Sequence, residues 1–151
     1  MKILLATDGA KQSDAAVEML KLFALNDSDE IMIVSVVDMA VPMAIDIYGG
    51  YLPDTTELEK TARENASKIL GETVEKVKKI FEGRKPNISS EVLFGSPDSR
   101  IVETAEETTV DLIIVGSHGY SRWERLLLGS VSDSVVHHAP CSVLVVRTNK
   151  E

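Results

Sequence analysis

The stretch Asp111-Leu-Ile-Ile-Val115 leads directly into Gly116-Ser-His-Gly119, and Gly129-Ser130 follows nine residues later. The apolar run predicts a buried strand, and Val131-Ser-Asp-Ser-Val-Val136 after the glycines predicts a helix. A glycine-bearing loop between a strand and a helix can hold a phosphate, because glycine lets the backbone approach an anion and the first helical N–H groups are unpaired. The same glycines also suit ordinary turns, so on their own they leave both interpretations open.

Length and composition predict one acidic globular domain. The chain has 151 residues, of which 44% are hydrophobic and 26% charged. Its net charge of −8 argues against a nucleic-acid partner and gives no support for binding to an anionic membrane. Cys141 is the single cysteine, so an internal disulfide is excluded and a reducing compartment is expected. Because neither a signal peptide nor a membrane-length apolar run is present, we expect a cytoplasmic protein.

Short apolar runs alternate with amphipathic segments along the whole chain. The runs predict strands over 2–7, 31–37, 88–94, 111–115 and 141–147, with 88–94 the most exposed of them because of its serines and glutamate. Helices are predicted to begin at Ser13 or Asp14, at Thr55 or Thr56, at Pro97 with Ser96 as N-cap, and at about Val131. Strands that are apolar throughout are typical of parallel sheets. The alternation predicts an α/β fold, a single-domain open doubly wound parallel five-stranded sheet over 1–151 with helices on both faces.

Two segments qualify this pattern. The longest predicted helix ends near Gly83 and carries an apolar stripe of Leu58, Ala62, Ala66, Ile69, Thr73, Val77 and Ile80. The segment Asp38–Pro53 is too irregular to form a helix or a strand, and it is more apolar than a solvent-exposed loop without a function would be. It is interpreted either as a flap over a site or as a contact surface for a partner.

Several familiar sites are absent from the sequence. A Walker-type phosphate loop, a G-x-G dinucleotide fingerprint and a G-x-S-x-G hydrolase elbow all fail to match. His137 and His138 fall at a predicted helix end, where a partly charged imidazole interacts favourably with the helix macrodipole. A helix-end or surface role is therefore favoured over a metal site for both residues. Cys141 opens an apolar strand and is expected to pack there.

Charge near the glycine loop differs from that of the whole chain. Arg122 and Arg125 stand beside one acidic residue, Glu124. They suit phosphate oxygens, although two solvated arginines explain the pattern equally well. If the first and fourth strands are neighbours, Asp8 lies across the crevice from Gly116 and can bind a ribose hydroxyl or a base. The alternative is that Asp8 only caps the first helix in a tight turn.

The spacing Gly116-x2-Gly119-x9-Gly129-Ser130 resembles the ATP-binding signature of the universal stress proteins. Ile3-Leu-Leu-Ala-Thr-Asp-Gly9 and His138-Ala-Pro-Cys-Ser-Val-Leu-Val-Val146 also resemble that family, and the resemblance covers essentially the whole chain. Ala10 departs from it, since many members have serine there.

The resemblance implies a sheet order of 3-2-1-4-5, a homodimer formed through Val143–Val146, and Mg or Mn held mainly by ATP phosphates. The implied ATP-binding residues are Ala6, Asp8, Val36, Gly116, Ser117, His118, Gly119, Ser121, Arg122, Gly129, Ser130, Val131 and Ser132.

Three functions follow as hypotheses. The first is a nucleotide-dependent regulatory or stress-response module that binds ATP. The second is a slow ATPase or an autophosphorylating protein, and the third is a dimeric adaptor that binds no nucleotide. No catalytic residue is assigned, since little in the loop suits orientation of a water molecule, and any hydrolysis is expected to be weak.

Overall fold

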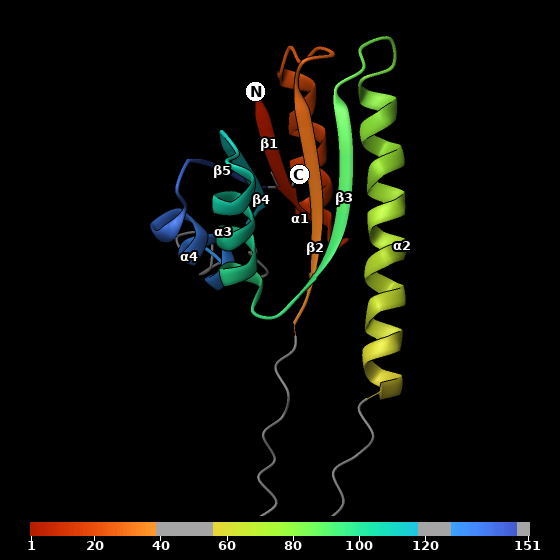
Figure 1. Cartoon of the computed structure of the whole chain (residues 1–151), viewed down its shortest axis with the longest axis vertical. Coiled ribbons are helices and arrows are strands. Elements are labelled where there is room, and N and C mark those ends of the chain that lie inside the picture. The colour runs from red at the N-terminus through yellow and green to blue at the C-terminus, as the bar shows by residue number, and fades with distance from the viewer. Residues whose placement is uncertain (39–55, 118–127, 148–151) are drawn as a thin grey trace, which may run out of the picture.

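Five parallel strands form one sheet in the order β3-β2-β1-β4-β5 in the computed structural model, which describes residues 1–38, 56–117 and 128–147 (Figure 1). The strands are β1 (Lys2–Ala6), β2 (Glu30–Val37), β3 (Asn87–Phe94), β4 (Leu112–Gly116) and β5 (Ser142–Val146). The central strand β1 pairs with β2 on one side and with β4 on the other. The predicted sheet order and the predicted adjacency of the first and fourth strands are both confirmed.

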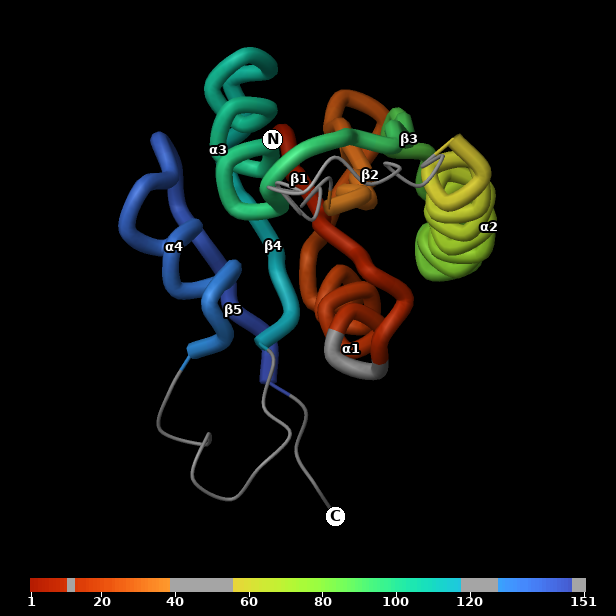
Figure 2. The backbone as a smooth tube through the Cα atoms, turned by 90° about the horizontal axis from the view of Figure 1, so that it is seen from below, coloured from red at the N-terminus to blue at the C-terminus, as the bar shows by residue number. Residues whose placement is uncertain are grey.

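Helices cover both faces of the sheet, as Figure 2 shows from the side of the strands' carboxyl ends. The helices α1 (Lys11–Met19), which continues as the 3₁₀ turn Leu20–Leu22, and α2 (Thr56–Ile80) lie on one face. On the other face lie α3 (Pro97–Thr108) and α4 (Ser130–His138). None of the helices in the described part of the chain has the length and apolarity that crossing a bilayer requires.

The sheet separates two apolar cores. On the α1 and α2 face, Ile3 and Leu5 of β1 pack in one cluster with Val17, Leu20 and Val77. On the opposite face, Leu4 packs in a second cluster whose other members include Val34, Ile101, Val115 and Val135. Neighbouring residues of β1 point to opposite faces because side chains alternate along a strand. The continuous apolar run at the start of the sequence therefore serves both cores.

Helix α2 is longer than the sheet against which it packs. Its 25 residues span about 37 Å, whereas the eight residues of β2 span about 26 Å. Figure 1 shows its first turns reaching past the carboxyl ends of the strands. The prediction that Leu58 belongs to the buried stripe is wrong, because its side chain lies in these turns and is 69% exposed. The buried positions further along are Ala66, Leu70, Thr73 and Val77.

The observed first residues of α3 and α1 can be compared with the predicted helix starts. Helix α3 has Ser96 at its N-cap and Pro97 at its first position, as predicted, but the Ser96 hydroxyl donates to Asp98 Oδ1 (2.6 Å) rather than capping the helix. Helix α1 begins at Lys11 with Ala10 as its N-cap. The prediction that Ser13 or Asp14 opens this helix is therefore wrong, and Ser13 lies within the first turn.

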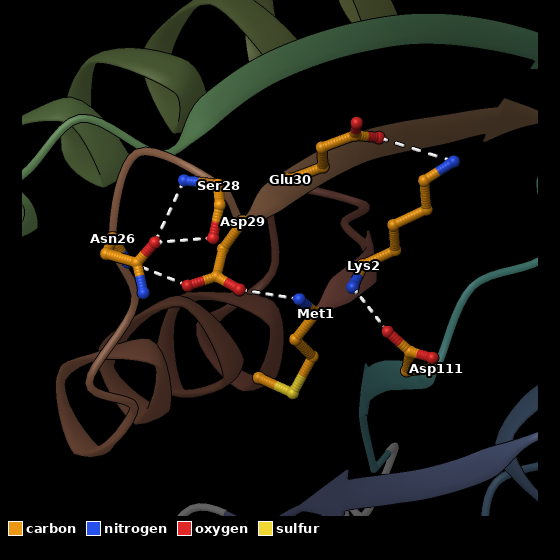
Figure 3. Close-up of polar contacts among 7 residues, drawn as sticks. All are labelled: Met1, Lys2, Asn26, Ser28, Asp29, Glu30 and Asp111. Atoms are coloured by element: carbon orange, nitrogen blue, oxygen red, sulfur yellow. Dashed lines mark hydrogen bonds and ion pairs between the residues drawn. The ribbon is translucent and has the colours of Figure 1, made fainter.

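The amino-terminal edge of the sheet is held by a network of polar contacts (Figure 3). The Met1 ammonium lies 2.5 Å from Asp29 Oδ1, and the Asn26 N–H donates to Asp29 Oδ2 (2.7 Å). The Lys2 N–H donates to Asp111 Oδ2 (2.6 Å). The hydrogen bond to Asp29 raises the pKa of the Met1 ammonium, and the same bond lowers the pKa of Asp29. These contacts fix the end of the sheet opposite the candidate site.

Candidate functional site

The carboxyl ends of β1 and β4 mark the point where the chain switches faces. Helix α1 follows β1 on one face, and α4 follows β4 on the other. The register pairs Leu5 with Ile114, so the residues just beyond both strands meet at the same edge. A crevice between diverging connections is where open α/β sheets bind ligands.

A pocket of about 220 Å³ opens at this edge. Its lining residues come from β1, the loop after it, β2, β4, α3 and the first turns of α1 and α4. They are Ala6, Thr7, Asp8, Ser13, Val34, Val36, Pro97, Ile101, Val115, Gly116 and Val131. Most of the lining side chains are apolar, and the polar ones are Thr7, Asp8 and Ser13. An apolar slot with a few polar groups suits a flat ring system with polar substituents.

The polar side of the pocket is formed by the loop between β1 and α1. Asp8 Oδ1 accepts hydrogen bonds from the Ala10 N–H (2.9 Å) and from the Ser13 hydroxyl. The Asp8 N–H in turn donates to Ser13 Oγ (3.2 Å). Asp8 therefore organises the turn before α1 and also lines the pocket, so the two interpretations of this residue are compatible.

The wall formed by β2 offers backbone groups. The Thr7 N–H donates to the Val34 carbonyl (2.9 Å), just beyond the end of β1. Alternate residues of a parallel strand direct their N–H and C=O groups to the same neighbour. Val36, two residues after Val34, therefore faces the space beyond the end of β1, where its N–H and C=O can recognise the edge of a ring.

The first turn of α4 forms a third wall. Gly129 is the N-cap, with φ −63° and ψ 153°, and no side chain caps the helix among the described residues. The Ser132 hydroxyl donates to the Gly129 carbonyl (2.9 Å), as does the Asp133 N–H (2.8 Å). The N–H groups of the three preceding helical residues have no partner within the helix. Together with the helix dipole they favour an anion beside Val131, which lines the pocket.

The predicted site residues fall into three groups in the structure. Those that line the pocket are Ala6, Asp8, Val36, Gly116 and Val131. Those that are described but lie outside its lining are Ser117, Gly129, Ser130 and Ser132. Those outside the described residues are His118, Gly119, Ser121 and Arg122. The backbone N–H of Ser117 donates to the Val146 carbonyl (2.8 Å), so the sheet already uses this group.

Six lining residues were missed from the sequence: Thr7, Ser13, Val34, Pro97, Ile101 and Val115. Pro97 and Ile101 were within reach of prediction, because a helix that follows a parallel strand begins at the carboxyl edge where ligands bind. Ser13 was missed because the helix start was placed at this residue instead of two residues earlier.

The histidines of α4 and the cysteine, which could in principle bind a metal or act as a nucleophile, lie outside the pocket lining. His137 Nδ1 and His138 Nδ1 each lie 2.8 Å from a carbonyl of α4, those of Asp133 and Ser134. Within the described ranges, no group of three His, Cys, Asp or Glu side chains is placed to hold a metal ion. Cys141 is half-buried, and burial raises the pKa of its thiol, which makes it a weak nucleophile at neutral pH.

Comparison with known proteins identifies the family. The chain matches the universal stress protein family over residues 1–147, and it therefore belongs to that family. It is 33% identical to universal stress protein MJ0531 of Methanocaldococcus jannaschii over 150 residues, which cover 99% of this chain and 84% of the relative. The solved structure of protein MJ0577 from the same organism is 26% identical, with a TM-score of 0.79 over 99% of this chain and 97% of the other.

A second solved structure, of a universal stress protein in complex with cAMP, is 25% identical. Its TM-score is 0.65, and the match covers 99% of this chain and 98% of that protein. The resemblance read from the sequence is thus confirmed at the level of the family and the fold.

Proposed function

We propose that this universal stress protein binds ATP in the pocket at the carboxyl edge of its sheet and acts as a nucleotide-dependent regulatory or stress-response module. The observation that carries the proposal is the pocket itself. It brings an apolar slot, the Asp8 carboxylate and the first turn of α4 together where the chain switches faces.

In this proposal the adenine, the ribose and the phosphates each contact a different side of the pocket. Adenine occupies the apolar slot, with its polar edge toward the backbone of Val36. The ribose lies near Asp8. The phosphates extend toward the start of α4 and the glycine loop, where the helix dipole and unpaired N–H groups favour negative charge.

The related universal stress protein in complex with cAMP supports a ligand that contains adenine, and it does not bear on the ribose, because the phosphate of cAMP is bonded to the 3′ oxygen. The glycine spacing from Gly116 to Ser130 supports ATP within that class. In the proposal Mg or Mn is held mainly by the phosphates, and the cytoplasm is the proposed location.

We also propose a homodimer formed through β5. This strand lies at the edge of the sheet, and its residues Val143, Leu144 and Val145 are only half-buried. An apolar edge strand needs cover against uncontrolled pairing, and a second copy of the same strand supplies it. Light scattering on the protein and on Leu144→Lys tests this, and a monomeric mass for the unaltered protein contradicts it.

Two measurements test nucleotide binding. The first is denaturation of the purified protein, followed by analysis of any adenine nucleotide released. The second is titration with Mg-ATP of the nucleotide-free protein and of two variants of α4, Val131→Phe and Val136→Phe. Val131 lines the pocket, whereas Val136 is 43% exposed and lies outside the lining.

We expect Val131→Phe to weaken binding at least tenfold by filling the slot, and Val136→Phe to bind as the unaltered protein does. ATP at a hundred times its Kd should also stabilise the unaltered protein by about 2.7 kcal/mol. A protein that releases no nucleotide and shows no stabilisation by Mg-ATP contradicts the proposal.

A further inference from the structure

We propose that Ser13 is a positioning residue that fixes the Asp8 carboxylate, so that the pocket selects nucleotides with free ribose hydroxyls over those that lack these hydroxyls or carry phosphate on them. This inference rests on the proposed function and specifies the ligand of the same pocket. It concerns a residue for which neither the glycine spacing nor the comparisons supply a role.

The contacts between Ser13 and Asp8 are reciprocal. The Ser13 hydroxyl donates to Asp8 Oδ1, and Ser13 Oγ accepts from the Asp8 N–H (3.2 Å). Ser13 is only 5% exposed and itself lines the pocket. The buried Ser13 hydroxyl is therefore hydrogen-bonded both to the backbone N–H and to the carboxylate of Asp8.

The loop is also confined from the side of α2. Gly9 has φ +74°, and a Cβ atom at this position would lie 3.0 Å from Ile69 Cγ1. The loop backbone thus packs closely against α2 while Ser13 and Ala10 hold the Asp8 side chain. Asp8 is solvent-exposed, and these contacts restrain the orientation of its carboxylate beside the pocket that it lines.

The chemistry of a fixed carboxylate is selective. It accepts hydrogen bonds from hydroxyl groups, and it repels a phosphate placed at the same position. Dinucleotide sites make the same distinction, in which an acidic residue binds a ribose hydroxyl and arginine accommodates a phosphate. Because the Ser13 hydroxyl donates its hydrogen bond to Asp8, the pair presents a hydrogen-bond acceptor rather than a donor to the ribose.

A purely structural role for Ser13 makes a different prediction. If the hydroxyl only stabilised the turn before α1, its loss would weaken the binding of every nucleotide by the same factor. If it positions Asp8, its loss reduces the preference between nucleotides that differ only at the ribose. The ratio of two dissociation constants separates these cases, whatever happens to overall stability.

The experiment measures the dissociation constants of four nucleotides by calorimetry. ATP is compared with 2′,3′-dideoxy-ATP, and AMP with adenosine 3′,5′-bisphosphate. The proteins are the unaltered chain, Ser13→Ala, Ser13→Thr and the control Ser28→Ala, whose site lies in the loop drawn at the opposite edge in Figure 3. Thermal unfolding of each variant checks that it is folded.

We expect the unaltered protein to prefer ATP over the dideoxy nucleotide about tenfold, the usual value of one charge-assisted hydrogen bond. It should also prefer AMP over the bisphosphate. Ser13→Ala should bring both ratios close to one, whereas Ser13→Thr, which keeps the hydroxyl, and Ser28→Ala should preserve them.

Three results would overturn the inference in distinguishable ways. Equal weakening of all four nucleotides by Ser13→Ala would reduce Ser13 to a structural residue. Binding of ATP without any preference at the ribose would remove the selective role of the pair but leave the proposed function intact. Failure of the unaltered protein to bind any of the four would overturn the proposed function and this inference together.

Discussion

Replacing Gly9 by alanine should destabilise the protein by an amount that the structure allows to be calculated. The residue has φ +74°, a conformation that costs an L-amino acid about 1–2 kcal/mol. The added Cβ would lie 3.0 Å from Ile69 Cγ1 and 3.1 Å from Ile69 Cδ1. Overpacking of this kind costs about 1–3 kcal/mol. The expected total of roughly 2–5 kcal/mol is a large fraction of a typical stability of about 5–15 kcal/mol.

The two contributions can be separated by urea denaturation of a double-mutant cycle. Ile69→Ala removes both close atoms, so Gly9→Ala in that background should cost only the backbone part of about 1–2 kcal/mol. The matched control is Gly71→Ala on α2, where an added Cβ meets nothing within 4 Å. This second glycine lies in a helix interior, so its replacement should stabilise the protein by about 0.5–1 kcal/mol.

Equal stabilities for the Gly9 and Gly71 variants would refute the argument at its first step. A cycle with no coupling between positions 9 and 69 would refute the second step, because it would mean that α2 does not confine the loop. The same variants also bear on the pocket. Displacement of the loop that carries Asp8 should weaken ATP binding in Gly9→Ala and leave it unchanged in Gly71→Ala.

Three further predictions concern groups outside the pocket. Asp29→Asn should lower stability between pH 3.8 and 8.0, the ordinary pKa values of the carboxyl and of the Met1 amine, as followed by urea midpoints against pH. Folding lowers the pKa of Asp29 and raises that of the Met1 amine. The difference in stability between the variant and the unaltered protein should therefore vanish as pH falls below this window and as it rises above it. Ser134→Ala removes a 2.7 Å hydrogen bond to Asp98 Oδ2, which joins α4 to α3, and should cost about 1 kcal/mol. Since hydrogen bonds from Ser96 and Ser134 lower the pKa of Asp98, this variant should also raise it toward 3.8 in an NMR titration, and an unchanged value would contradict the contact. Cys141 should react with iodoacetamide with an apparent pKa above 9.0, since burial disfavours its thiolate, and fast alkylation at neutral pH would contradict this.

Much of the fold followed from the sequence because its strands are continuous apolar runs. Such runs fit only a sheet covered on both faces, and the alternation with helices then fixes parallel strands and crossovers. Asp8 and Gly116 could be placed together for the same reason, since both follow neighbouring parallel strands. The sheet order itself came from the resemblance to a family, because periodicity does not specify which strands pair.

The parts that were missed depend on tertiary packing. Leu58 has helical spacing with the buried stripe, but the sequence does not reveal that the helix outreaches the sheet. Serine is a common N-cap residue, which is why Ser13 was expected at the helix start. In the structure Ala10 is the N-cap and its N–H donates to Asp8, and the Ser13 hydroxyl also donates to Asp8. Pro97 and Ile101 could be expected near the carboxyl ends of the strands, but the packing of α3 on the sheet decides that they line this pocket. Four of the predicted ATP-binding residues lie outside the described part of the chain and remain predictions.

The division of the interior into two cores has a consequence for how the molecule would respond to a ligand. The apolar lining of the pocket at Ala6, Val34, Val36, Ile101, Val115 and Val131 belongs entirely to the core beneath α3 and α4. A bound molecule therefore adds apolar contacts to that core, whereas the start of α1 on the other face offers it the polar side chain of Ser13. Amide hydrogen exchange should slow in α3 and α4 when the pocket is filled, while the amides of α2 over the other core keep nearly the rate of the empty protein. One face of the sheet thus supplies the apolar side of the pocket, and the other face borders it only at the start of α1.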